Sequence, residues 1–141
     1  MSHMVRAILL VEDNPMDVDL TQRAFAKHKL NNPIDVARDG EEALAHLKNW
    51  ENGASPPGLI LLDLKLPKVD GLEVLRRLKS HPQFCTIPVV VLTTSTEERD
   101  IQTAYQLGVN SYITKPVSFD RFMEVAAQIN LYWTDLNTPP R

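Results

Sequence analysis

The sequence of 141 residues has a single cysteine, no long apolar run and no region dominated by charge of one sign. Cys85 cannot form an intramolecular disulfide by itself, so we expect a domain held together by an apolar core. No segment is typical of a signal peptide, and none is apolar over the roughly 18 residues that a membrane helix needs. We therefore expect a cytoplasmic protein with no membrane partner.

Basic residues are not concentrated in any part of the chain. The 15 Lys and Arg residues and the 18 Asp and Glu residues give a formal net charge of -3. Domains that bind nucleic acid usually present a basic face, which nothing in this sequence predicts. We therefore expect no nucleic-acid partner.

The length suits one domain, and no repeat or low-complexity segment divides the chain. A second methionine, Met4, lies just before the first apolar run, so we interpret residues 1–4 as the remnant of a cloning tag. Residues 5–141 are then predicted to form one domain with a carboxyl-terminal helix and a short tail. The linker-like residues 51–58 are too few to separate two domains.

Apolar runs alternate with amphipathic segments, which predicts alternating strands and helices. Most of the apolar runs are continuous, as is typical of strands covered on both faces of a sheet. The predicted strands are residues 7–11, 33–37, 59–62, 88–92 and 111–114. The predicted helices are residues 15–28, 40–48, 71–80, 96–107 and 119–132.

Local signals indicate where several helices begin and end. Asn14 and Ser118 are typical cap residues, Ser95 with Glu98 matches a capping box, and Gly108 is suited to end a helix. These signals support the predicted boundaries.

The helix predicted at 71–80 has leucines at intervals of three residues, which indicates the face that packs on the sheet. We assign its basic side chains to the solvent-exposed side: Arg76, Arg77 and Lys79. The histidines at positions 28, 46 and 81 lack the spacing of metal ligands, and we interpret them as surface residues.

Alternation of five strands with five helices predicts a (βα)5 chain. Right-handed crossovers favour an α/β fold with a doubly wound, five-stranded parallel sheet, in the flavodoxin-like strand order 2-1-3-4-5. Ligands of such sheets bind beyond the carboxyl ends of the strands where the winding reverses, here the first and third strands. The site is therefore predicted to follow Val11 and Leu62.

Acidic residues follow both of these strands. Glu12 and Asp13 follow the first strand and Asp63 follows the third. Such carboxylates repel one another unless a cation lies between them, and their oxygens suit Mg²⁺. A simple helix-capping role is the alternative, but Asn14 already supplies the first cap and Asp63 lies too far before the helix at Gly71. We therefore predict a metal site.

Two further groups are predicted to reach the same edge of the sheet. Thr93 or Thr94 ends the fourth strand, and Lys115 ends the fifth. A hydroxyl, an ammonium and Mg²⁺ could together surround the oxygens of a phosphoryl group on Asp63. A cis bond between Lys115 and Pro116 would turn the lysine inward; cis is the minority form of such bonds, and the sequence does not decide between cis and trans.

Five motifs resemble those of the response-regulator receiver family, in the same order and over nearly the whole chain. The motifs are residues 11–15, 61–67, 70–71, 91–95 and 112–116. The resemblance implies a two-component signal transduction response regulator that accepts a phosphoryl group from a sensor histidine kinase. Such a protein is not an enzyme in the usual sense, because it catalyses only its own phosphorylation and dephosphorylation.

The resemblance also implies a role for each site residue. Asp63 is the phospho-acceptor, and Glu12, Asp13, Asp63 and the backbone carbonyl of Lys65 hold Mg²⁺. Lys115 pairs with the phosphoryl group. One departure is Glu12, where many receivers have aspartate, which changes the reach of the first carboxylate.

The same resemblance implies a conformational switch. Thr93, and not Thr94, matches the switch hydroxyl, and Tyr112 matches the switch aromatic. Phosphorylation is then expected to change the surface formed by the fourth helix, fifth strand and fifth helix.

More narrowly, the chain resembles the stand-alone regulators that partner bacterial phytochromes. This rests on the long loop at 49–58, the segment 87–95 and the aromatic pair Tyr132 and Trp133. A phytochrome histidine kinase is therefore an expected partner.

A homodimer is expected on the same face, with the aromatic tail contributing. One helical stripe is predicted to pack on the sheet: Phe122, Ala126, Ile129 and Trp133. Further large apolar groups remain near the helix ends: Phe119, Met123, Tyr132 and Leu136. They either form a partner surface or extend the core.

Two other functions share parts of this pattern. An FMN carrier needs a neutral, glycine-rich phosphate loop after the first strand, where this chain has Glu12 and Asp13. An aspartate-nucleophile phosphatase of the haloacid dehalogenase type resembles this chain in its Asp, Thr, Lys and Mg²⁺, but has a second aspartate two residues after the nucleophile. Here that residue is Lys65, a poor general base.

Overall fold

The computed structural model describes residues 6–140 and has the predicted α/β fold. The parallel strands are β1 (Ile8–Val11), β2 (Ile34–Ala37), β3 (Leu59–Leu62), β4 (Val89–Thr93) and β5 (Ser111–Thr114). The helices are α1 (Pro15–Lys27), α2 (Gly40–Glu51), α3 (Gly71–Lys79), α4 (Glu98–Gln106) and α5 (Phe119–Leu131), followed by a π-helix, η1 (Tyr132–Leu136). The strand order β2-β1-β3-β4-β5 confirms the predicted topology. The interpretation of residues 1–4 as a tag remnant lies outside the described residues.

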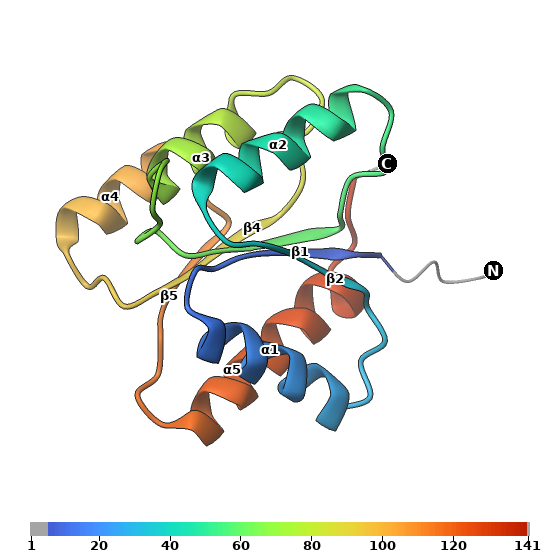
Figure 1. Ribbon diagram of the computed structural model, residues 1–141, viewed down its shortest axis with the longest axis vertical. Coiled ribbons are helices and arrows are strands. Elements are labelled where there is room, and N and C mark those ends of the chain that lie inside the picture. The colour runs from blue at the N-terminus through green and yellow to red at the C-terminus, as the bar shows by residue number, and fades with distance from the viewer. Residues whose placement is uncertain (1–5, 141) are drawn as a thin grey trace.

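The sheet is the middle of three layers (Figure 1). Helices α1 and α5 cover one face, and α2, α3 and α4 cover the other. Successive strand residues point to opposite faces, so in β1 Ile8 and Leu10 pack towards α1 and α5, whereas Leu9 and Val11 pack towards the other layer. The residues of β1, β3 and β4 are all buried, and all are apolar except Thr93, which ends β4. None of the described helices is long and apolar enough to cross a membrane.

Helix α2 continues one turn beyond its predicted end. The reason is Trp50, which is buried and meets Phe84 edge-on with ring centroids 5.7 Å apart. The His81 ring stacks on the Phe84 ring, with centroids 4.5 Å apart. Its Nδ1 atom accepts from the Gln83 and Phe84 amides. The interpretation of His81 as a simple surface residue is therefore wrong, because its ring shapes the turn before β4.

Contrary to the prediction, the Lys79 side chain does not point into solvent from α3. Its ammonium donates to the carbonyl oxygens of Cys85 and Ile87 at 3.0 and 2.9 Å, and to Asn110 Oδ1 at 2.8 Å. A helical-periodicity argument misses this because the long side chain runs along the surface to the turns before β4 and β5. Lys79 thus ties α3 to two loops.

The start of α4 also differs from the prediction. The helix begins at Glu98 without a side-chain cap, so the expected capping box is wrong. Ser95 instead donates through Oγ to Asp100 Oδ2 at 2.6 Å and accepts from the Glu97 amide at 3.3 Å. The predicted caps Asn14 and Ser118 are confirmed by hydrogen bonds to the backbone of α1 and α5.

Candidate functional site

Parallel pairing places the predicted acidic residues side by side. Val11 of β1 is in register with Leu62 of β3, so the residues that follow them, Glu12 and Asp63, emerge together. The Asp63 amide donates to the Val11 carbonyl oxygen at 3.0 Å, which extends the pairing one residue beyond the strands. Both side chains are buried, whereas that of Asp13 is exposed. The predicted meeting of these carboxylates is confirmed.

Lys115 is fixed in the same way on the other side. Thr93 of β4 is in register with Thr114 of β5, and the Lys115 amide donates to the Thr93 carbonyl oxygen at 2.7 Å. The peptide bond between Lys115 and Pro116, whose isomer the sequence leaves open, is trans. The lysine backbone is therefore held by the sheet while its side chain reaches across it.

The Lys115 ammonium lies among three carboxylates. Its Nζ atom is 2.7 Å from Glu12 Oε1, 2.9 Å from Asp63 Oδ2 and 2.8 Å from Asp17 Oδ2, and its side chain is only 7% exposed. Burial opposes the charged form, but the hydrogen bonds to Asp17 and Glu12 outweigh it and raise the pKa of Lys115. The site therefore contains a fixed positive charge beside Asp63.

The three predicted metal ligands form a compact set. Ligand oxygens of Glu12, Asp13 and Asp63 all lie within 4.8 Å of one another. Burial raises the pKa of Glu12 to about 7 and repulsion from Asp63 adds to the effect, against the hydrogen bond from Lys115. Clustered, partly desolvated carboxylate oxygens are the donors that a hard divalent cation prefers. The residues therefore fit such an ion.

The loop after β3 is held close to Asp63 by a glycine. A Cβ atom at Gly71 would lie 2.5 Å from the Asp63 carbonyl oxygen, so only glycine lets α3 start here. The Gly71 amide donates to the Leu64 carbonyl oxygen at 3.1 Å. The Lys65 amide donates to Asp63 Oδ1 at 3.2 Å, which orients the carboxylate.

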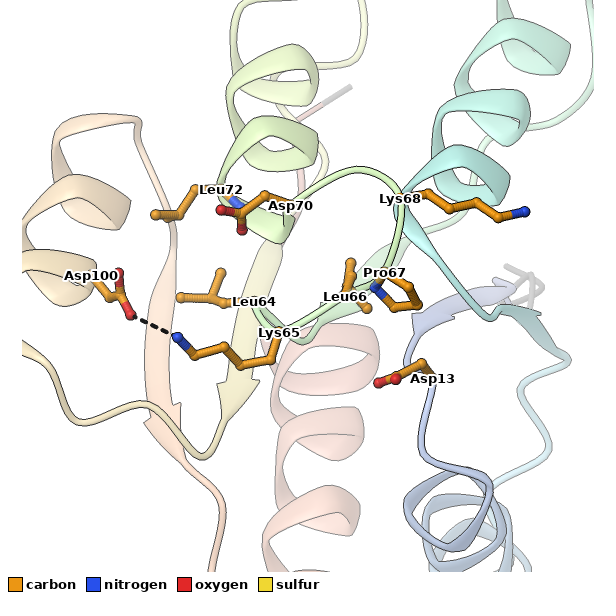
Figure 2. A pocket seen from close by; sticks show the side chains of 9 residues that line it. All are labelled: Asp13, Leu64, Lys65, Leu66, Pro67, Lys68, Asp70, Leu72 and Asp100. Carbon is orange, nitrogen blue, oxygen red and sulfur yellow. Dashed lines mark hydrogen bonds and ion pairs between the residues drawn. The ribbon is translucent and has the colours of Figure 1, made fainter.

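Figure 2 shows the pocket that borders this loop, a cavity of about 540 Å³ with Asp13 at one end and Asp100 at the other. The Lys65 side chain extends towards Asp100, with Nζ 3.8 Å from Oδ2. The pocket is lined by Asp13, Leu64, Lys65, Leu66, Pro67, Lys68, Asp70, Leu72 and Asp100. The pocket therefore reaches Asp13, the exposed member of the acidic cluster.

The predicted switch residues belong to the strands next to the acidic cluster, Thr93 to β4 and Tyr112 to β5. Thr93 is buried, whereas Thr94 is exposed, and Thr93 Oγ1 accepts from the Ser95 amide at 3.4 Å. Tyr112 is half-buried and donates its hydroxyl to the Ser95 carbonyl oxygen at 2.9 Å. Burial raises the pKa of Tyr112, so the hydroxyl remains protonated and able to donate. The loop between β4 and α4 is thus attached to β5.

Sequence reasoning missed two acidic residues. Asp17 lies in the first turn of α1, where acids are common because they interact well with the helix dipole, so its position alone gave no sign of a contact with Lys115. Asp100 lies in the first turn of α4, where an acid is equally common, so its contacts with Ser95 and Lys65 were not predictable either.

Comparison with known proteins identifies one family. The family model of the response regulator receiver domain matches residues 8–127. The chain is 46% identical to the probable methanogenesis regulatory protein FilR2 of Methanothrix harundinacea, over 94% of this chain and 86% of that protein. It is 40% identical to response regulator Rcp1 of Synechocystis sp., over 99% of this chain and 96% of that protein.

Two crystal structures are similar throughout. The phosphorylated cyanobacterial phytochrome response regulator RcpA has a TM-score of 0.92 at 44% identity, covering 98% of this chain and 100% of that chain. The Mn²⁺-bound form of Rcp1 has a TM-score of 0.88 at 40% identity, covering 96% of this chain and 99% of that chain. The alternative of a haloacid dehalogenase phosphatase is not supported. The chain belongs to the response regulator receiver domain family and is a two-component response regulator.

Proposed function

We propose that Asp63 accepts the phosphoryl group of a sensor histidine kinase in a reaction that depends on Mg²⁺. One observation carries this proposal: the Lys115 ammonium lies 2.9 Å from Asp63 Oδ2 at the edge of the acidic cluster. An anionic carboxylate can attack an anionic phosphoryl group only where positive charge offsets their repulsion.

The proposed step exchanges one bond to phosphorus for another. A carboxylate oxygen of Asp63 bonds to phosphorus, the bond to the kinase histidine nitrogen breaks, and that nitrogen keeps the electron pair. Lys115 neutralises charge on the phosphoryl oxygens, and Thr93 supplies a hydroxyl donor. Mg²⁺, held by Glu12, Asp13, Asp63 and the Lys65 carbonyl oxygen, would neutralise charge on the same oxygens. Rcp1, which is similar to this chain, has a Mn²⁺-bound form, and this supports binding of a divalent ion.

We further propose that the protein catalyses only its own phosphorylation and dephosphorylation. The residue two positions after Asp63 is Lys65, whose side chain is engaged near Asp100, so no second carboxylate is positioned there as general acid and base. Turnover of external phosphate esters is therefore not expected.

Substitution of Asp63 tests the proposal. Asp63→Asn is expected to abolish labelling by a phosphorylated kinase or by acetyl phosphate, because an amide is not a nucleophile here. Asp70→Asn is the matched control, since it removes a carboxylate from the same loop while asparagine still caps α3. Undiminished label on Asp63→Asn would contradict the assignment, as would full labelling in the presence of excess chelator.

The switch is proposed to act on the face formed by α4, β5 and α5. Movement of Thr93 towards a phosphoryl oxygen would disturb its contact with the Ser95 amide, and Ser95 also binds Tyr112 and Asp100. A local change in charge would thus reach α4 and β5 through one loop.

We propose a phytochrome histidine kinase as the partner, with phosphotransfer in the cytoplasm. The phytochrome response regulator RcpA, at 44% identity over 98% of this chain, supports this choice. FilR2 is 46% identical over 94% of this chain and carries the name of a methanogenesis regulator. The test therefore compares phosphotransfer from a phytochrome kinase with phosphotransfer from an unrelated sensor kinase. Phosphotransfer from a phytochrome kinase that is no faster than from an unrelated sensor kinase would contradict the partnership.

We also propose a homodimer on the same face. Phe119, Tyr132 and Leu136 are exposed, whereas Met123 and Trp133 pack against the core, so only part of the predicted apolar set extends the core. A groove of about 430 Å³ lies between β5 and α5 and reaches the aromatic pair at 132–133. A second copy of this chain is proposed to cover it.

A further inference from the structure

Besides the three predicted metal ligands, a fourth carboxylate belongs to the site: that of Asp17, which contacts the Lys115 ammonium but lies outside the metal-ligand set. Its Oδ2 atom is 2.8 Å from Lys115 Nζ, and its side chain is 17% exposed. In the part of the chain that the structure describes, the compact set of ligand oxygens comprises Glu12, Asp13 and Asp63 only. Asp17 can therefore bind the lysine without sharing its charge with a metal ion.

The Lys115 ammonium has three N–H donors and contacts three carboxylates, at 2.7, 2.8 and 2.9 Å. Two of these partners change in the proposed reaction. Asp63 becomes an acyl phosphate, and Glu12 shares its charge with the metal. Asp17 is the partner that the reaction leaves unchanged.

The Asp17 carboxylate is itself well placed to act as an anchor. It belongs to the first turn of α1, where Asn14 Oδ1 accepts from the Met16 amide at 2.9 Å. The Asp17 carbonyl oxygen accepts from Thr21 Oγ1 at 2.8 Å. These contacts fix the backbone on which the carboxylate is carried.

We propose that Asp17 is a positioning residue that holds the Lys115 ammonium at the phosphoryl site before and after transfer. This inference rests on the proposed function of Asp63. A lysine is a point charge on a long flexible stem, so its value to the reaction depends on what fixes its end. With Asp17 present, one hydrogen bond of the ammonium stays in place while the others change.

A purely structural role for Asp17 makes a different prediction. An acid in the first turn of a helix stabilises the helix dipole, and this effect does not involve Lys115. Asp19 provides the comparison, because it lies on the same helix with its side chain 55% exposed and paired with Arg23. Asp17→Asn and Asp19→Asn remove the same charge, and only the first removes an anion from the lysine.

The two variants are compared in labelling by acetyl phosphate in saturating Mg²⁺. Asp17→Asn is expected to lower the rate constant at saturating donor by roughly tenfold, because a misplaced charge-stabilising group loses much of its effect. The donor concentration for half-saturation is expected to change by less than about twofold, as is the rate of Asp19→Asn, whose charge is screened by solvent. Asp17→Asn should bind Mg²⁺ within about twofold of the parent, whereas Asp13→Asn binds it more weakly.

A double-mutant cycle with Lys115→Met separates positioning from other effects. If Asp17 acts through the lysine, Asp17→Asn has no further effect on labelling in that background. A readout independent of labelling is the NMR signal of the Lys115 ammonium in metal-free protein. It is expected to be lost through faster hydrogen exchange in Asp17→Asn and retained in Asp19→Asn.

Three results would overturn the inference: an unchanged labelling rate and ammonium signal in Asp17→Asn, an undiminished effect in the Lys115→Met background, or a loss of Mg²⁺ affinity as large as that of Asp13→Asn. Failure of the proposed function is distinguishable, because Asp63→Asn would then still be labelled. If Asp63→Asn is silent and Asp17→Asn behaves as the parent, the positioning role alone is wrong.

Discussion

At the scale of single residues, Glu12 experiences opposing influences. It is buried, it lies beside Asp63, and it accepts a hydrogen bond from Lys115. Burial is the largest of these influences and raises the pKa of Glu12 to about 7. A divalent ion must therefore displace a proton from Glu12 whenever the pH is below that value.

We predict that affinity for Mg²⁺ rises as the pH is raised through about 7, with release of a proton on binding. Because the folded-state pKa lies above the ordinary value of 4.5, the folded metal-free protein binds more protons than the unfolded chain between these values. Its free energy of unfolding should accordingly fall as the pH rises through that window. Calorimetry in buffers of different ionisation enthalpy measures the proton, and thermal unfolding measures the stability.

Glu12→Gln is the control for this prediction. The amide cannot ionise, so the pH dependence of Mg²⁺ affinity near pH 7 should be largely lost even though binding is weaker. Proton release of the same size in Glu12→Gln would show that another group titrates.

Lys79 contributes to stability and not to the site. We predict that Lys79→Met lowers the free energy of unfolding by about 2 kcal/mol, because the methionine keeps the apolar stem but leaves the Cys85 and Ile87 carbonyl oxygens without this donor. Arg77→Met on the exposed side of α3 is the matched control and should change stability by less than about 0.5 kcal/mol. Equal effects of the two variants in urea unfolding would contradict the role of Lys79.

Sequence reasoning was informative for residues that follow strands and poor for residues that act across elements. Asp63 and Lys115 were predictable because parallel strands end at a common edge. Asp17 and Lys79 were not, since their partners lie 98 and up to 31 positions away in the sequence. Local periodicity contains no information on such contacts.

At the scale of elements, the loop between β4 and α4 connects the site to the surface. Ser95 in this loop contacts Thr93, Asp100 and Tyr112, which belong to β4, α4 and β5. The predicted capping box at this point was wrong because Ser95 turns to Asp100 instead of the backbone of Glu98. Because α4 has no side-chain cap and Asp100 in its first turn accepts from Ser95, a change at Ser95 is expected to affect the start of this helix.

We predict that Thr93→Ala is phosphorylated but responds only weakly. A complete shift from about 1:99 to 99:1 needs roughly 5.5 kcal/mol, more than the roughly 0.5–3 kcal/mol of one hydroxyl contact. Lys115 must therefore share the task, and a partial response should remain. Amide NMR shifts of α4 and β5 with and without acetyl phosphate measure it, with Thr94→Ala as the exposed neighbouring control. A full response in Thr93→Ala would contradict the scheme.

At the scale of the whole molecule, the topology was predictable because the apolar runs are short, continuous and separated by helical patterns. The end of the chain was not. Residues 132–136 form a π-helix after α5, in which Trp133 packs against the core while Tyr132 and Leu136 remain exposed, at 49% and 65%. Removing this segment would therefore damage the core as well as any interface.

Point substitutions test the proposed dimer without that damage. A stable interface buries at least roughly 1,000 Å² in total, and an aromatic side chain supplies only about 150–250 Å² of it, so the groove between β5 and α5 must also be covered.

We predict that the parent dimerises and that Tyr132→Ser combined with Leu136→Ser weakens dimerisation by at least tenfold, about 1.4 kcal/mol. Met16→Ser, which removes an exposed apolar side chain from α1, is the control and should leave it unchanged. Sedimentation equilibrium at several concentrations, with and without acetyl phosphate, measures the association. A parent that is monomeric in both states, or a double variant that dimerises as the parent does, would contradict the proposed face.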